Sequence, residues 1–152
     1  MSTSIDRSIP WLFRASAVLW AIWGIVHIFA GFMTLKFIGA GQTAEAFHGI
    51  TSAVDIASLR LEYPAAVSAV LSQHGFNLAW FGLVTLVASP FVWRQRSLAV
   101  YLAALVGGLA DVGYFVFIDL GGFATPPGPQ MTWICAAAVI TGLAGVFRSR
   151  RA

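Results

Sequence analysis

Four long apolar stretches constrain the fold of this chain more than any other feature of its sequence. They cover about residues 15–35, 66–93, 98–120 and 131–147. A helix needs roughly 20 mostly apolar residues to cross the hydrocarbon core of a bilayer, and backbone groups in lipid must be paired within their own segment. The stretches lack the apolar–polar alternation of membrane barrel strands. The sequence therefore predicts an all-α, integral membrane four-helix bundle.

The composition supports lipid as the principal solvent. The chain is 59% hydrophobic and only 10% charged, whereas soluble domains carry about 25% charged residues. Its 152 residues fit a single membrane domain. The predicted partner is thus the lipid bilayer, and the net charge of +3 calls for no nucleic acid, because anionic lipid headgroups are sufficient counterparts.

The positive charges predict an orientation. Seven of the nine Lys and Arg residues precede the first span, link the second to the third, or follow the fourth. With an even number of spans these positions fall on one side, and loops rich in Lys and Arg stay in the cytoplasm. Both termini are therefore expected to be cytoplasmic. One cysteine excludes an internal disulfide, and with no organelle signal a bacterial inner membrane is expected.

The connection between the first two spans contains its own helical pattern. Thr43 is a suitable N-cap, and Phe47, Ile50, Val54 and Leu61 recur at helical spacing among polar residues. We expect an outer amphipathic helix over about residues 43–61, lying at the membrane interface or over the mouth of the bundle.

Three ionisable residues on three different spans constitute the main functional signal. His27, His74 and Asp111 each lie in the outer half of a span, and His27 and Asp111 are roughly 12 Å below the outer boundary at 1.5 Å per residue. A charged residue near the bilayer centre costs at least about 2.5–3.5 kcal/mol. These side chains should therefore face the bundle interior, where Asp111 should pair with a histidine.

The leading functional hypothesis is a metal or haem site. Two imidazoles and one carboxylate suit Zn, Cu or non-haem Fe, and two histidines can ligate haem b axially. Glu45 and His48 form an E-x-x-H pair that recurs in di-metal bundles, and they would close the site from outside. On this hypothesis the protein is oxidoreductase-like or handles metal; whether it is an enzyme stays open, and no catalytic residue is predicted.

Two other classes of function remain. The first is a solute-binding, lipid- or quinone-binding, or proton-coupled transport bundle, which with four spans would require a homo-oligomer or a larger membrane complex. The second is a structural or accessory subunit in which the polar centre fixes helix register. The residues expected to line the pocket or support the site are Gln73, Asn77, Trp23, Trp80 and Tyr114.

Overall fold

The computed structural model describes residues 8–59, 62–126 and 128–151 as an all-helical bundle, with no strand in this part of the chain. Its long helices are α1 (Ser8–Gly39), α3 (Ala65–Trp93), α4 (Ser97–Tyr114) and α5 (Gly128–Ser149). A π-helical turn, η2 (Phe115–Asp119), continues α4. The short helices α2 (Thr43–Ile50) and η1 (Ile56–Ser58) lie between α1 and α3.

Four of the described segments are long and apolar enough to cross a membrane. Their bounds are Ile9–Gly39, Ala65–Trp93, Ser97–Asp119 and Gly128–Ser149. Many of their large apolar side chains point outward: Leu98 is 80% exposed and Trp133 70% exposed. Apolar surface of this extent needs lipid rather than water around it. The predicted membrane four-helix bundle is therefore confirmed.

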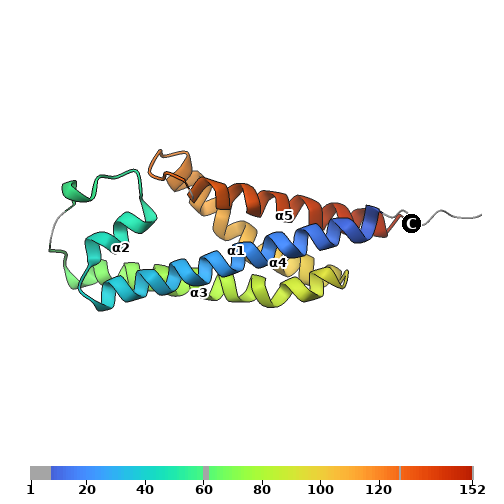
Figure 1. Ribbon diagram of the computed structural model, residues 1–152, viewed down its shortest axis with the longest axis horizontal. Coiled ribbons are helices and arrows are strands. Elements are labelled where there is room, and N and C mark those ends of the chain that lie inside the picture. Colours follow the sequence, from blue (N-terminus) through green and yellow to red (C-terminus); the bar gives the residue numbers. More distant parts are fainter. Residues whose placement is uncertain (1–7, 60–61, 127, 152) are drawn as a thin grey trace, which may run out of the picture.

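The four long helices pack in a ring. α1 lies against α3 on one side and α5 on the other, and α4 completes the ring by packing on α3 and α5. Figure 1 shows that α1 begins and α5 ends at the same end of the bundle, while α2 lies at the opposite end. We call the end that carries α2 the α2 end.

Glycines bring α1 and α3 into very close contact. Gly24 of α1 faces Gly82 of α3, and Gly31 faces Gly75; a Cβ added at Gly24 would lie 2.7 Å from the Gly82 carbonyl oxygen. Small residues let helix backbones approach closely in lipid, where apolar burial alone gives no preference for helix association. The seven-residue spacing on both antiparallel helices keeps the two contacts on one face.

The centre of the bundle is filled by aromatic residues from α1. Trp20 is completely buried and reaches across to α4, where a Cβ at Gly107 would lie 2.5 Å from the indole ring. Ser16 donates a hydrogen bond of 2.8 Å to the Ala138 carbonyl of α5, and Gly142 makes room for this serine. The small residues of α5 thus face α1, as expected of a tight bundle.

The outer helix is shorter than the sequence predicted. α2 ends at Ile50, and the chain then turns so that His48 Nδ1 donates to the Val54 carbonyl at 2.9 Å. Asp55 caps η1 by accepting from the Ala57 amide at 3.0 Å. These local bonds offer the backbone an alternative to continued helix. Residues 60–61, at the end of the predicted helix, lie outside the described residues.

Side chains hold α2 and the following turn over the bundle. At its start, the hydroxyls of Thr43 and Ser68 on α3 are 3.0 Å apart. Beyond its end, Ser52 Oγ accepts from the Thr125 amide at 2.8 Å and from the Thr125 hydroxyl at 2.9 Å. The Ala53 amide donates to the Phe123 carbonyl. The roof of the α2 end is therefore attached to both α3 and the segment before α5.

Basic residues gather at the other end of the bundle. The guanidinium of Arg14 lies 5.4 Å from the Trp93 ring centroid, and that of Arg150 lies 6.0 Å from the Tyr101 ring centroid. These contacts join the start of α1 to the end of α3, and the residue after the end of α5 to the first part of α4. The grouping of charges expected from an even number of spans is present in the structure.

Candidate ligand cavity

Two adjoining cavities lie between α1, α3 and α4 beneath α2, with volumes of about 260 and 540 Å³. Six residues line both cavities, and His27, His74 and Asp111 are among them. The shared residues are His27, Ile50, His74, Leu78, Asp111 and Tyr114. The expectation that His27, His74 and Asp111 face one interior space agrees with this arrangement.

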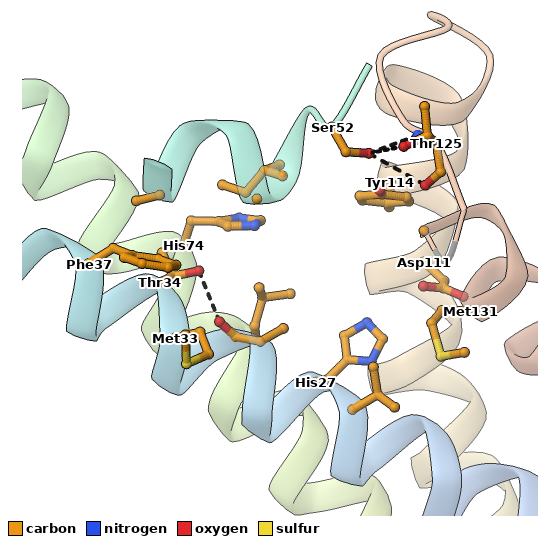
Figure 2. A pocket seen from close by; sticks show the side chains of 17 residues that line it. His27, Met33, Thr34, Phe37, Ser52, His74, Asp111, Tyr114, Thr125 and Met131 are labelled. Atoms are coloured by element: carbon orange, nitrogen blue, oxygen red, sulfur yellow. Dashed lines mark hydrogen bonds between the residues drawn. The ribbon is translucent and has the colours of Figure 1, made fainter. Parts of the chain in front are cut away.

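The ring of His27 has a defined hydrogen-bonding state. Its Nδ1 lies 2.8 Å from the Trp23 carbonyl oxygen, and because a carbonyl can only accept, Nδ1 carries the proton. Neutral His27 therefore presents Nε2 as a hydrogen-bond acceptor, and in Figure 2 one ring nitrogen points into the cavity. The ring also stacks on the buried Trp23 indole, with centroids 3.6 Å apart and planes 20° from parallel. Trp23 thus fixes both the position and the tautomer of His27.

The carboxyl of Asp111 is buried with unused hydrogen-bonding capacity. Its side chain is only 6% exposed, and Oδ2 is buried without a hydrogen-bond partner. The Cys135 thiol and the Trp23 indole lie beside the carboxyl, yet the Trp23 Nε1 is also unpartnered. An unsatisfied buried polar atom costs about 1–3 kcal/mol, so this oxygen calls for a partner.

The predicted pairing of Asp111 with a histidine is not formed. His27 Nδ1 is used by the Trp23 carbonyl, and no hydrogen bond joins Asp111 to His27 or His74 in the described part of the chain. The carboxyl and the imidazoles instead line the cavity as separate groups. Figure 2 shows them placed around its interior, with His74 on the side of α3.

Apolar groups form most of the remaining wall. Phe37 and Met33 of α1 line the first cavity together with Met131 of α5. Tyr114 lines both cavities, and its hydroxyl approaches the backbone of α5 so closely that a Cβ at Gly128 would lie 2.5 Å away. A site with apolar walls and a few converging polar groups is typical of small-molecule pockets.

Helix α2 covers the first cavity with one of its faces. Ala46, Gly49 and Ile50 line the first cavity at the i, i+3, i+4 spacing of a single helical face. Glu45 and His48 each precede one of these residues and lie about 100° around the helix, outside both cavities. The structure therefore does not bring Glu45 and His48 to the other candidate ligands.

The polar residues of α3 also lie on different faces of their helix, and only some of them reach a cavity. Asn77 lines the larger cavity, whereas Gln73 is exposed and Trp80 is 38% exposed, with its indole donating to Asn77 Oδ1 at 3.1 Å. Neither Gln73 nor Trp80 lines a cavity that contains His74. Of the expected supporting residues, Trp23, Asn77 and Tyr114 are near the site.

The donor arrangement does not support a metal ion. Among the described residues, no three His, Cys, Asp or Glu side chains are grouped so that they could hold one. His27, His74 and Asp111 share a cavity, but Glu45 and His48 contribute nothing to it.

Sequence reasoning missed several wall residues. Met33, Phe37 and Met131 carry no signal that distinguishes them from lipid-facing residues. Ser52 and Thr125, which close the roof and also line the cavity, lie in connecting segments whose pairing could not be foreseen. Thr34 lies seven residues, or two helical turns, after His27, and this spacing is the one signal that could have placed it on the cavity face.

No protein-family model, curated protein sequence or solved structure matches this chain. The fold and the cavity therefore define its class: a polytopic helical membrane protein with a roofed, polar-centred cavity at one end.

Proposed function

We propose that this protein binds a small, lipid-soluble molecule in the cavities at the α2 end, with an apolar body against the helices and a polar head at His27 and Asp111. A lipid- or quinone-like molecule has this chemistry. The observation that carries the proposal is the buried, unpartnered Asp111 Oδ2 in the wall of two cavities of about 260 and 540 Å³. Ligand pockets commonly measure about 300–1,000 Å³ and place few polar groups among apolar walls.

The hydrogen-bonding state of His27 indicates which head group fits. Nδ1 is occupied by the Trp23 carbonyl, so neutral His27 offers an acceptor at Nε2 and requires a donor from the ligand. A hydroxyl, as in a phenol or a quinol, supplies that donor, and its lone pairs can accept from the Tyr114 hydroxyl, or from the Asp111 carboxyl when that carboxyl carries a proton. A ligand without a donor would leave Nε2 unpaired, at a cost of about 1–3 kcal/mol.

The covering of the cavities by α2 and the turn after it supports a ligand-binding role for the polar residues rather than a role in helix packing alone. α2 is attached at both ends, through Thr43 to α3 and through Ser52 to Thr125, yet empty volume remains below it. A polar cluster that served only to fix helix register would be expected to pair its own groups, whereas the Asp111 Oδ2 is unpaired.

Titration with a matched ligand pair tests the proposal. The pair is para-hexylphenol and its methyl ether, in which a methyl group replaces the hydroxyl proton, and both are titrated in detergent. We expect saturable quenching of tryptophan fluorescence by the phenol, because Trp23 stacks on His27, and about tenfold weaker binding of the ether.

Two variants provide controls for this titration. His27→Ala should weaken the phenol by about tenfold and remove the preference over the ether. Leu98→Ala, on the exposed outer surface, should bind as wild type. Failure of both ligands to bind saturably in the folded protein, or equal effects in the two variants, would exclude the proposed site.

Axial ligation of haem by His27 and His74 is the second candidate function. One observation favours it: an Nδ1–H bond to a backbone carbonyl is the usual arrangement of a metal-ligating histidine. Haem binding predicts a Soret band that disappears in both His27→Ala and His74→Ala. A colourless, folded protein after expression with added haem would exclude it.

We further propose a bacterial inner-membrane location with both termini in the cytoplasm. The support is the gathering of Arg14 and Arg150 at one end of the bundle, together with the preference of Lys and Arg for cytoplasmic loops. The ligand cavities would then open towards the outer leaflet.

A further inference from the structure

A third cavity, of about 480 Å³, runs between α4 and α5 on the outside of the bundle. We call it the α4–α5 groove. Its lining is almost entirely apolar, with Asp111, Thr132 and Cys135 as the polar exceptions. The apolar lining includes Ala104, Gly108, Leu109, Trp133, Val139 and Ile140.

The α4–α5 groove faces the hydrocarbon of the bilayer. Its rim residues Leu109, Trp133 and Ile140 are 63%, 70% and 66% exposed, and they lie within the candidate spans Ser97–Asp119 and Gly128–Ser149. Water is absent at this depth of a membrane. Only molecules dissolved in the bilayer can therefore fill the groove.

Asp111 belongs to the groove and to both inner cavities. On α5, Met131 lines the inner cavity, while Thr132 and Cys135 line the groove. Asp111 is thus common to the two spaces, and Met131, whose side chain is unbranched and adaptable, lines the inner cavity directly before the groove residue Thr132 in the chain. Figure 2 labels Asp111 and Met131 among the residues that line the inner cavity.

Small residues keep the groove open next to Asp111. A Cβ at Gly108 would meet only Val139 Cγ2, at an ordinary van der Waals distance of 3.5 Å. Ala104, another small residue, lies one helical turn before Gly108 in α4. Beyond Tyr114, α4 widens into the π-helical turn η2, a feature that frequently marks functional sites. Neither helix closes the groove at the level of the carboxyl.

We propose that the α4–α5 groove is the membrane-side entrance to the ligand cavities, and that it holds the apolar part of the ligand while the head group reaches Asp111. This inference rests on the proposed function and adds the route and the class of ligand, an amphipathic molecule dissolved in the bilayer. An ordinary acyl chain in the groove would leave Oδ2 unpartnered, whereas a chain that ends in a hydrogen-bonding head satisfies it.

Labelling with carbodiimides tests the entrance without any ligand. The O–H of a carboxyl group adds across a C=N bond of the carbodiimide: the acid oxygen bonds to the central carbon of the reagent and the proton moves to its nitrogen. The adduct then rearranges to a stable N-acylurea. In lipid vesicles we expect dicyclohexylcarbodiimide, which dissolves in the bilayer, to label Asp111, with the peptide identified by mass spectrometry. A water-soluble carbodiimide should label Asp111 at least about tenfold more slowly.

Two substitutions distinguish the routes. Gly108→Phe fills the groove, and we expect labelling by the bilayer-soluble reagent to slow by at least about tenfold. Gly113→Phe enters the larger inner cavity instead, where an added Cβ meets nothing within 4 Å, and should leave labelling from the bilayer unchanged. Ala104→Phe, a second groove variant, should behave like Gly108→Phe, and circular dichroism shows whether each variant is folded.

Three results would contradict the proposed entrance. The first is equal labelling of Asp111 by both reagents, and the second is slower labelling in Gly113→Phe but in neither groove variant. The third is that Asp111 is not labelled in the folded protein but is labelled after unfolding in dodecyl sulfate. Because no ligand takes part, these results leave the phenol titration unaffected. Labelling through the groove combined with no phenol binding would instead contradict the proposed function alone.

Discussion

Substitution of Gly31 by alanine should loosen the contact between α1 and α3. A Cβ at this position would collide with the Gly75 carbonyl of α3 and lie 2.7 Å from the Ala79 amide nitrogen. Both atoms belong to backbone, so no side-chain rotation relieves the overlap and the helices must separate. Overpacking of this kind costs about 1–3 kcal/mol.

Gly113 provides the matched control. It lies inside α4, where an added Cβ meets nothing within 4 Å. Replacing glycine by alanine within a helix gains about 1 kcal/mol of intrinsic propensity, and this gain is common to both variants. The difference in unfolding free energy between Gly31→Ala and Gly113→Ala therefore isolates the overpacking cost, which we expect to be about 1–3 kcal/mol.

Reversible unfolding in mixed micelles of dodecyl sulfate and a mild detergent, followed by circular dichroism, measures this difference. Gly82→Ala, which would collide with the Gly24 carbonyl at the other glycine contact between α1 and α3, should lose stability like Gly31→Ala. If Gly31→Ala proved as stable as Gly113→Ala, the backbones of α1 and α3 would not be in contact, and the reasoning about this interface would be refuted.

Two further expectations concern the roof and the orientation. Ser52→Ala removes the acceptor that ties the turn after α2 to Thr125, so para-hexylphenol should dissociate several-fold faster with little change in unfolding free energy, as stopped-flow fluorescence would show; an unchanged rate would mean that the roof does not open. In a Cys135→Ala background, a membrane-impermeant maleimide added to spheroplasts should label Ser58→Cys on the outer side and spare Ser149→Cys, whereas the reverse pattern would invert the proposed orientation.

The spans were predictable because their physical signal is local. A run of apolar residues must be lipid-facing or buried wherever it lies, so length and hydropathy were sufficient to locate the four long helices. Their ends were less well defined: α1 extends from Ser8 to Gly39, beyond both predicted limits, because helical hydrogen bonding continues into the interface.

The inward direction of side chains was predicted only in part. The sequence indicated that Asp111 faces the bundle interior but not which other residues of α4 do: its buried residues are Val100, Ala103, Gly107 and Asp111, whereas Ala104 and Gly108 line the α4–α5 groove. Asp111 therefore lies at the border of two faces, one inside the bundle and one towards α5. A hydrophobic helix has no polar face from which its rotation could be deduced.

The long-range pairings were beyond the reach of the sequence. His27, His74 and Asp111 were expected in one layer from their depths alone, and all three line the same cavities. Their partners were not foreseen, since the Trp23 carbonyl that fixes His27 is a backbone atom. The position of α2 depends on Ser52 and Thr125, which are 73 residues apart in the chain.

Photoaffinity labelling tests the ligand cavity most directly. An alkylphenol that carries a diazirine on its chain, irradiated with the protein in lipid vesicles, should crosslink to cavity residues such as Ala30, Tyr114 and Met131. An excess of para-hexylphenol should abolish these crosslinks, and Asp111→Ala should reduce them. Crosslinks confined to outward-facing residues such as Ile25 and Leu98, insensitive to competitor, would contradict a ligand site within the bundle.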